Sequence, residues 1–350
     1  MADPRYSCQV KLPKFGGARQ SKLQKSKVLV VGAGGLGCPA SLYLAAAGIG
    51  KIEIVDFDKI EISNLHRQIL FSEEDVGKYK CKIVAKALQK QNPNIDISAK
   101  VKRVTSKNVE SIIKGFDVVV DCTDNYDARY ILNFGCVRQN IPVVYGAAYQ
   151  YEGQVAVWNT KNLDGSRSPN YLDIFPRAEN AIIADCATGG VLPTLTGIIG
   201  CMQANEVIKY ITGVGNLLKS KLLILDGLTL QSKIINLPKK SFRTPDDTAV
   251  EEKESLLISV KELEANIDNY QLIDVRSASE RARFNIGGLN IPLENIFDDV
   301  GLVSTVKPVV FYCETGGRSL VATKYFNQRT SMNALSLEGG MAKWQKIINN

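Results

Sequence analysis

Apolar runs of strand length alternate with helical patterns through residues 27–146. The apolar runs lie at 27–32, 51–56, 117–121 and 142–146, with helices predicted between them, notably at 79–91 and 126–139. A parallel sheet covered by helices on both faces has strands that are apolar throughout, because neither side of the strand meets water. This order therefore predicts a Rossmann-like, doubly wound α/β fold.

The pattern changes in the middle of the chain. Residues 151–158 and 221–236 are predicted to add antiparallel strands, and apolar positions at helical spacing predict a long helix over 190–211. Residues 159–188 are polar and without a period, and loops of this length are usually functional. Residues 238–255 are charged and hold two prolines, which is typical of a linker between domains.

Beyond this linker, short buried strands again alternate with helices. The strands are predicted at 272–276, 309–313 and 334–337. This arrangement predicts a second, smaller α/β domain. The chain is therefore divided into a first domain over 1–237, a linker over 238–255 and a second domain over 256–350.

The first predicted strand runs directly into a glycine-rich turn. Gly32, Gly34 and Gly37 are spaced G-x-G-x-x-G, a helix former follows, and the next strand ends in Asp56. Glycines let backbone amides approach a phosphate closely, the start of a helix favours an anion, and a later carboxylate can hold a ribose hydroxyl. The unit is therefore predicted to bind a nucleotide, a property that many dehydrogenases share.

Composition narrows the class of protein. The chain is 45% hydrophobic and 23% charged, and no apolar run approaches the roughly 20 residues that cross a membrane, so a cytoplasmic protein is expected. The net charge of +7 is spread along the chain, and no basic and aromatic module supports binding to nucleic acid. The single histidine, His66, disfavours a Ser-His-Asp or Cys-His relay.

The eight cysteines form no C-x-x-C pair. A zinc site built on cysteine knuckles is therefore not expected. Most of the cysteines, Cys201 in the predicted long helix among them, are expected to be small residues of the core.

Several separated motifs follow the nucleotide unit in order. They are Phe57-Asp58, Ser63-Asn64-Leu65-His66-Arg67-Gln68, Gly77-Lys78-Tyr79-Lys80, Asp121-Cys122-Thr123-Asp124-Asn125 and Arg129. From residue 5 to about residue 236 the series resembles the MoeB/ThiF family of ubiquitin-activating-type enzymes, which adenylate the C-terminus of small sulfur-carrier proteins. A carboxylate becomes a good acyl donor once it is joined to AMP, and its activation needs mainly positioning and neutralised phosphate charge.

The resemblance implies an ATP site built from each of these motifs. Gly35 and Asp56 would bind the adenosine part, Asn64, Arg67 and Lys80 would contact the triphosphate, and Ser63, Leu65 and His66 complete that motif. Asp124 would hold Mg²⁺, and Asn125 would lie beside the nucleotide. Arg67 and Lys80 are the catalytic candidates, because they supply the cations. His66 is expected to be only a neighbour in the motif.

Two departures from the family pattern stand out. Cys8 occupies the position of an arginine that in relatives reaches the ATP of the partner across a homodimer, and Arg5 and Arg19 are alternatives for that contact. Many relatives also carry two C-x-x-C pairs that bind zinc. Here Asn170-Tyr-Leu-Asp173 replaces the first pair, and no cysteine lies near residues 239–242. Structural zinc is therefore predicted to be absent, and side-chain packing is expected to stabilise this loop instead.

Cys186 is the first candidate for sulfur chemistry. It lies just before the predicted long helix, whose N-terminus would stabilise a thiolate. The resemblance implies that this cysteine attacks the adenylated carrier or shares a disulfide with it. A buried structural cysteine is the alternative.

Cys313 is the second candidate. The segments 272–276, 287–293, 313–319 and 337–344 make the chain from about 256 to 350 resemble a rhodanese domain. Cys313 is expected at the end of a buried strand, with the next helix beginning near Arg318. The loop that follows the cysteine would curl its amides around a thiolate or persulfide; its residues are Glu314, Thr315, Gly316, Gly317 and Arg318. A packed cysteine at a strand end is the alternative.

Together these motifs predict an adenylyltransferase joined to a sulfurtransferase. With ATP and Mg²⁺ it would adenylate the C-terminal glycine of a ubiquitin-like sulfur carrier of the MoaD/ThiS type. Cys313 would then pass on sulfur from a donor such as a cysteine desulfurase, which gives the carrier thiocarboxylate. Family members of this layout act in molybdopterin biosynthesis, thiamine biosynthesis or tRNA thiolation, and a homodimer is expected. The alternatives are an adenylation-only or non-catalytic carrier-binding protein, and an NAD-dependent oxidoreductase.

Overall fold

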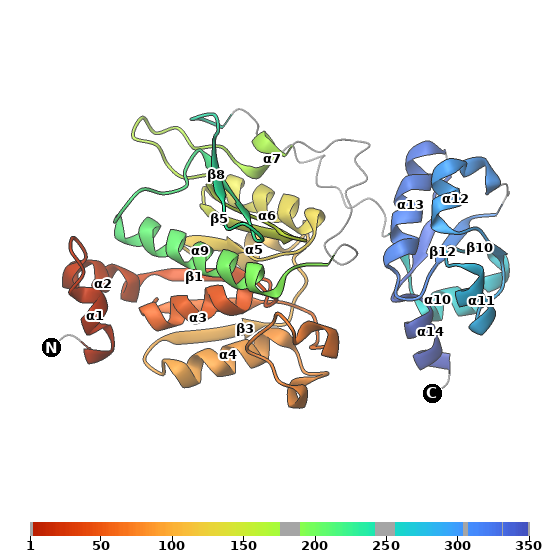
Figure 1. Cartoon of the computed structure of the whole chain (residues 1–350), viewed down its shortest axis with the longest axis horizontal. Coiled ribbons are helices and arrows are strands. Elements are labelled where there is room, and N and C mark those ends of the chain that lie inside the picture. Colours follow the sequence, from red (N-terminus) through yellow and green to blue (C-terminus); the bar gives the residue numbers. More distant parts are fainter. Residues whose placement is uncertain (1–2, 176–189, 242–255, 304–306, 331, 349–350) are drawn as a thin grey trace. The chain divides into compact units, whose positions relative to one another are not determined.

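The structure is a computed structural model that describes residues 3–175, 190–241, 256–303, 307–330 and 332–348. These residues divide into two compact units, one within 3–241 and one within 256–348 (Figure 1). Each unit has its own sheet and its own core.

An eight-stranded sheet with the order β3-β2-β1-β4-β5-β6-β7-β8 forms the centre of the larger unit. Strands β1 to β5 run parallel, and β6, β7 and β8 each run antiparallel to the strand before. The strands are β1 Lys27–Val31, β2 Lys51–Val55, β3 Asp96–Lys100, β4 Val118–Asp121, β5 Val143–Tyr149, β6 Glu152–Trp158, β7 Lys221–Asp226 and β8 Ser232–Asn236. The predicted doubly wound sheet and its antiparallel extension are confirmed, with 221–236 forming two strands rather than one.

Helices cover both faces of this sheet (Figure 1). One apolar cluster packs α3, α4 and α9 on one face, and a second packs α5 and α6 on the other. The helices are α1 Ser7–Val10, α2 Gly16–Lys25, α3 Gly37–Ala47, α4 Lys80–Gln91, α5 Val109–Ile113, α6 Tyr126–Arg138, α7 Tyr171–Ile174 and α9 Pro193–Thr212, with 3-10 turns η1 Pro4–Tyr6, η2 Ile62–Asn64 and η3 Glu73–Asp75. The long helix predicted over 190–211 is therefore α9.

The smaller unit has a five-stranded parallel sheet with the order β11-β10-β12-β13-β9. Two apolar clusters fill its two faces. The strands are β9 Leu257–Ile258, β10 Gln271–Asp274, β11 Leu289–Asn290, β12 Val309–Tyr312 and β13 Leu335–Leu337. The helices are α10 Val260–Ala265, α11 Ala278–Arg283, α12 Leu293–Asp298, α13 Gly317–Arg329 and α14 Gly340–Ile348, with turns η5 Ile267–Asn269 and η6 Val300–Leu302. The second α/β domain is confirmed.

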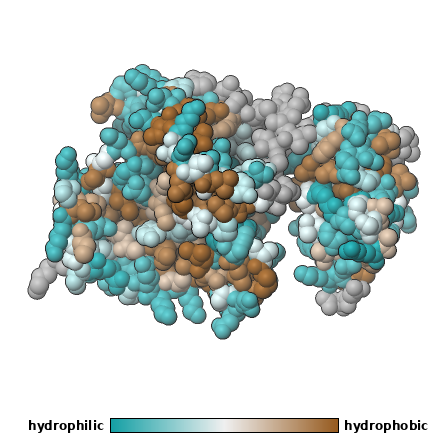
Figure 2. Space-filling model, in the orientation of Figure 1, coloured by the Kyte–Doolittle hydropathy of each residue, from teal (hydrophilic) through white to brown (hydrophobic). Residues whose placement is uncertain are grey.

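Apolar side chains reach the visible surface of the larger unit in separate patches between polar ones (Figure 2). Edge strand β8 is exposed along its whole length, and its Ile234 is 51% exposed. Within the part of the chain that the structure describes, no helix combines the length and the apolar character needed to cross a membrane.

Candidate active sites

The glycine turn lies at the carboxyl end of β1. Gly32 donates its N–H to the carbonyl of Val55 at the end of β2 (2.9 Å), and its φ of +98° favours glycine. A Cβ on Gly32 would stand 2.5 Å from the carbonyl oxygen of Cys122, just past β4, and a Cβ on Gly37 would overlap the carbonyl of Gly32. The ends of three strands therefore meet at a turn that requires glycine, with α3 beginning behind it. This is the arrangement that accepts a phosphate.

Asp56 follows β2 and faces this turn. Its Oδ2 accepts the N–H of Ala33 and its Oδ1 accepts the N–H of Asp58, both at 2.7 Å. Burial raises the pKa of the Asp56 carboxyl, and the two N–H groups act against that rise. Gly35 packs against α9, where a Cβ would stand 3.0 Å from Oγ1 of Thr196. A carboxylate at the end of the second strand is suited to hold a ribose hydroxyl.

Lys80 is the first residue of α4 and is only 8% exposed. Its Nζ lies 3.2 Å from Oδ2 of Asp58, and its backbone N–H donates to the carbonyl of the same residue. A buried ammonium group needs such a counter-charge. The structure therefore keeps the buried ammonium group of Lys80 close to Asp56. A phosphate that binds Lys80 would have to displace the carboxylate of Asp58.

The turn after β2 presents the next motif. Asn64 accepts the N–H of Glu61 through its Oδ1 (3.1 Å), so this side chain shapes the turn. Gln68 is 3% exposed, and its Nε2 lies 3.6 Å from the place of a Cβ on Gly34. Its Oε1 has no hydrogen-bond partner among the described residues. Sequence reasoning gave Gln68 no role, but its burial beside the glycine turn makes it a candidate ligand contact.

The rest of this motif lies on the surface of the turn. Arg67 donates from its guanidinium group to the carbonyl of Ser63 (3.2 Å), and the same nitrogen lies 3.1 Å from Nε2 of His66. Ser63 and His66 are exposed, whereas Leu65 is half-buried and packs against the core. Arg67 is therefore the part of this segment that offers a positive charge.

The loop after β4 carries the predicted magnesium ligand. Asp121 is buried, and its Oδ1 accepts both the N–H and the O–H of Thr123 (3.0 and 2.7 Å). Burial raises the pKa of the Asp121 carboxyl. Asn125 caps α6 by accepting the N–H of Ala128 (2.9 Å). Asp124 lies between these anchored residues and is exposed.

Two buried side chains hold that loop. Gln203 on α9 is fully buried, and its Nε2 donates to the carbonyls of Asp121 (2.7 Å) and Val144 (3.3 Å). Arg129 is 4% exposed and donates to the carbonyl of Thr123 (3.1 Å). Sequence reasoning missed Gln203, because its burial on the sheet side of α9 cannot be told from the exposed position of Asn205, another amide of the same helix.

The structure therefore brings most of the predicted nucleotide residues to one edge of the larger sheet. Gly35, Asp56 and Asp124 follow the carboxyl ends of β1, β2 and β4, and Lys80 begins the helix that packs beside them. Ligands of open α/β sheets bind at this edge.

Cys313 lies just past the end of β12 in the smaller unit, as predicted, and is 1% exposed. Its Sγ accepts the N–H of Gly316 (3.2 Å) and the N–H of Ser319 (3.4 Å), and the hydroxyl of Ser319 lies 3.5 Å away. Gly316 has a φ of +91°, which turns its amide inward at the start of α13. Such a group of N–H donors stabilises an anionic sulfur.

The hydroxyl of Ser319 is itself in contact with a second hydroxyl, that of Ser336. Ser336 on β13 is fully buried, and its Oγ lies 2.8 Å from Oγ of Ser319. If Ser336 donates in this pair, the single proton of Ser319 is shared between the sulfur of Cys313 (3.5 Å) and the carbonyl of Gly316 (3.1 Å), because a hydroxyl carries one proton. Sequence reasoning missed Ser336, which is a lone polar residue in a buried strand.

The exposed parts of the cysteine loop are held by ion pairs. Glu314 accepts from Arg276 (2.9 Å), which is itself paired with buried Asp274 (2.9 Å). Arg318 donates two hydrogen bonds to Glu280 of α11, from Nη1 to Oε2 at 2.9 Å and from Nη2 to Oε1 at 2.5 Å. Thr315 and Gly317 are exposed at the rim. The predicted loop residues are therefore together, with Arg318 engaged by a carboxylate.

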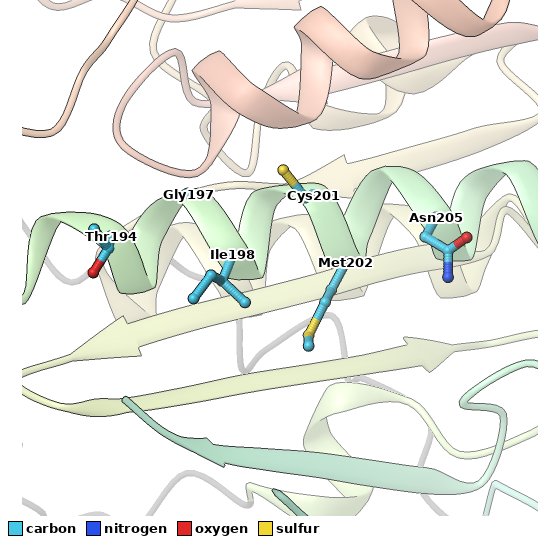
Figure 3. Close-up of a pocket in the computed structure, with 6 residues that line it drawn as sticks. All are labelled: Thr194, Gly197, Ile198, Cys201, Met202 and Asn205. Atoms are coloured by element: carbon cyan, nitrogen blue, oxygen red, sulfur yellow. The ribbon is translucent and has the colours of Figure 1, made fainter. Parts of the chain in front are cut away.

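Apart from Cys8, the cysteines outside this loop fall into three groups. Cys186 lies outside the described residues. Burial raises the pKa of the Cys38 thiol to about 12, as expected of a core residue. Cys201, which was expected in the core, is only half-buried and lines a shallow groove along α9 (Figure 3). The prediction for Cys201 is wrong because the side of α9 on which it lies is not fully covered.

The segments that replace the zinc pairs of relatives lie together. Asn170 donates from Nδ2 to Oγ of Ser241 (2.8 Å), and the N–H of Ser241 donates to the carbonyl of Arg167 (2.9 Å). Asp173 accepts the N–H of Asn170 (2.8 Å) in a capping box at the start of α7. Among the residues described, no group of three or more histidine, cysteine or acidic side chains is arranged to hold a metal ion.

At the N-terminus, Cys8 is exposed. Arg5 donates from its guanidinium group to the carbonyl of Gln91 (2.8 Å), and Arg19 donates to that of Phe15 (3.4 Å). Both alternatives for the missing arginine therefore make contacts within their own chain.

Comparison with known proteins covers almost the whole chain. The ThiF family matches residues 6–245, and the rhodanese-like domain matches residues 259–347. Two relatives, both named adenylyltransferase and sulfurtransferase MOCS3, align with 99% of this chain. The protein from Drosophila sechellia is 37% identical with 83% of its length covered, and that from Culex quinquefasciatus is 35% identical with 87% covered.

Solved structures support the fold of the larger unit. The structure of Escherichia coli MccB with ATP superposes with a TM-score of 0.60 at 24% identity, over 68% of this chain and 73% of that one. At this identity the likeness shows a shared fold.

Proposed function

The chain belongs to the ThiF family and carries a rhodanese-like domain, and from this premise we propose that it adenylates the C-terminal glycine of a ubiquitin-like sulfur carrier and converts it to a thiocarboxylate. The observation that carries the proposal is the pairing of two sites in one chain. A glycine turn with Asp56 and Lys80 suits a nucleotide, and a group of N–H donors around Cys313 suits a persulfide.

The first step activates the carrier. One oxygen of its terminal carboxylate attacks the α-phosphorus of ATP, the bond to the bridging oxygen breaks, and pyrophosphate leaves. The amides of the glycine turn bind phosphate oxygens, Asp56 holds the ribose, and Arg67 and Lys80 offset the negative charge. Gln68 lies beside Gly34 of the glycine turn, and Asn64 shapes the turn after β2. Little covalent help is needed, because the reaction is governed by position and charge.

Mg²⁺ fits the donor set at this edge. Asp124 is an exposed carboxylate beside anchored Asp121 and Asn125, and magnesium is usually held by one or two carboxylates together with phosphate oxygens. When bound, the ion supplies positive charge to the triphosphate. Asp124 is the residue that would hold it.

The second step transfers sulfur. The terminal sulfur of a Cys313 persulfide attacks the acyl carbon and AMP leaves, so that the carrier is joined to Cys313 through a disulfide. A thiolate, which we assign to Cys186, attacks the Cys313 sulfur and releases the thiocarboxylate. A dithiol reductant then restores the two cysteines. The persulfide comes from a donor such as a cysteine desulfurase.

The remaining parts of the proposal concern organisation. Residues 1–237 form the adenylation domain, 238–255 the linker and 256–350 the sulfurtransferase domain. The protein acts as a homodimer in the cytoplasm, in molybdopterin or thiamine biosynthesis or in tRNA thiolation.

Two measurements test this function. Carrier-dependent exchange between ATP and pyrophosphate is expected, and it should fall strongly in Asp124→Asn. Intact mass analysis of the carrier, after incubation with ATP and a sulfur donor, should show oxygen replaced by sulfur with the wild-type chain and not with Cys313→Ala. Exchange without sulfur incorporation would indicate an adenylation-only protein, and the absence of both would indicate a carrier-binding protein.

A further inference from the structure

The cysteine loop contains one arginine, Arg318, and a carboxylate already engages it. Arg318 lies directly before Ser319, whose N–H reaches the sulfur of Cys313, so its charge stands at the mouth of the site. Its guanidinium group makes two parallel hydrogen bonds to the carboxylate of Glu280. Bidentate pairs of this kind fix the direction of the arginine as well as offsetting its charge.

Glu280 is held in turn. The N–H of Ser277 donates to Oε2 of Glu280 (3.0 Å), and its hydroxyl donates to the same atom (2.9 Å), in a capping box at the start of α11. The carboxylate is therefore fixed in space, and the pairing with Arg318 lowers the pKa of Glu280 to about 2. Both side chains remain about one-third exposed, so an anion arriving from solvent meets an arginine whose charge is balanced.

The neutralisation of the Arg318 charge by Glu280 affects which sulfur donor the site accepts. Thiosulfate is a small dianion, and its approach to an anionic thiolate requires a cation to offset the repulsion. A persulfide on a protein carries less charge and brings contacts of its own. Both arginines paired with residues of the α11 and cysteine-loop segments have carboxylate partners: buried Arg276 is paired with Glu314, and Arg318 with Glu280.

We propose that Glu280 is a specificity-determining residue of the sulfur-transfer site. By engaging Arg318 it withholds the cation that a small dianionic donor needs, so that Cys313 is loaded from a protein-bound cysteine persulfide rather than from thiosulfate. This inference rests on the proposed role of Cys313 as the sulfur acceptor.

The reaction that tests this proposal is balanced with thiosulfate and cyanide as its only reagents. The Cys313 thiolate attacks the outer sulfur of thiosulfate, the sulfur–sulfur bond of thiosulfate breaks, and sulfite leaves with the electron pair. Cyanide then removes the outer sulfur of the persulfide as thiocyanate and restores the thiolate. The rate of thiocyanate formation therefore reports how well the site accepts thiosulfate.

The experiment uses the full-length chain. Glu280→Gln removes the charge and keeps an oxygen for the cap of α11, so the fold should be retained. We expect kcat/KM for thiosulfate to rise about tenfold, which corresponds to about 1.4 kcal/mol, mainly through a lower KM and less at high salt. Glu280→Asp, which keeps the charge but shortens the reach, should give a smaller rise. Each variant's thermal unfolding is recorded alongside.

Glu338→Gln is the matched control, because it removes the same charge from a pair with Lys343 in the same unit. It should leave kcat/KM for thiosulfate within about twofold of wild type, the range of an exposed ion pair. In an Arg318→Ala background, Glu280→Gln should give no gain. The proposal is overturned if Glu280→Gln and Glu280→Asp both match wild type, if the gain survives without Arg318, or if Glu338→Gln gains as much. Thiocyanate formation that persists in Cys313→Ala would instead refute the role of Cys313.

Discussion

Gln203 offers a direct test of how α9 supports the candidate nucleotide site. Its side chain is fully buried and donates to the carbonyls of Asp121, at the end of β4, and Val144, near the start of β5. Gly146 has no side chain at the point where Gln203 crosses, and a Cβ there would overlap its amide. The amide therefore reaches from a helix to two strands and fixes the position from which the loop 122–125 departs.

Gln203→Met keeps the length of the side chain and removes the donor. A buried carbonyl that loses its partner costs about 1–3 kcal/mol, so the two contacts together predict a loss of about 2–6 kcal/mol in the free energy of unfolding of the larger unit. At about 2–4 °C per kcal/mol for a unit of this size, the melting temperature should fall by about 4–24 °C. Because Asp124 lies on the loop, KM for ATP with magnesium should also rise.

The assays are urea unfolding and carrier-dependent pyrophosphate exchange. Asn205→Met is the matched control, since Asn205 is an exposed amide on the same helix; its effect on unfolding should stay within about 0.5 kcal/mol. A loss below about 1 kcal/mol in Gln203→Met, with an unchanged KM, would falsify the reasoning, because the loop would then be held by other contacts.

Three further predictions concern single side chains. Lys80→Met should lower pyrophosphate exchange about tenfold to a hundredfold, because a charge-assisted hydrogen bond is lost. Lys78→Met removes an exposed lysine and should not lower it. Equal losses in the two variants would rule out a specific role for Lys80. Ser336→Ala should slow thiocyanate formation at Cys313 about threefold to tenfold, because the hydroxyl network loses about 1 kcal/mol; an unchanged rate would show that the network does not reach the sulfur. The pKa of Glu280 is lowered from 4.5 to about 2, so its contribution to stability is present above pH 4.5 and is lost as the pH falls toward 2. Unfolding of the smaller unit, followed by the fluorescence of Trp344, should therefore depend less on pH in this range in Glu280→Gln, and identical profiles would contradict the pairing.

The elements that the sequence predicts well are those with a local cause. The buried parallel strands are apolar throughout, and the glycine turn follows from backbone geometry that no other residue tolerates. Strand β3 was missed because it is an edge strand of half-buried residues, Asp96–Lys100, with no apolar run. Strands β9 and β11 were missed because two residues carry no period.

The contacts that the sequence did not predict join residues that are distant in the chain. Glu280 and Arg318 are 38 residues apart, and Gln203 and Asp121 are 82 apart. Only the packing of α11 beside α13, or of α9 across the sheet, brings these groups within hydrogen-bond distance. A sequence motif identifies the residues of a site. The net charge around each residue depends on its hydrogen-bond and ion-pair partners, which are set by the fold.

Asn170 and Ser241 are joined by an amide and a hydroxyl, 71 residues apart. The sequence predicts that these segments bind no structural zinc, and the bond between Asn170 and Ser241 joins them without a metal. An amide and a hydroxyl neither oxidise nor need a metal to be delivered. Cells starved of zinc should therefore still accumulate this protein in its folded form.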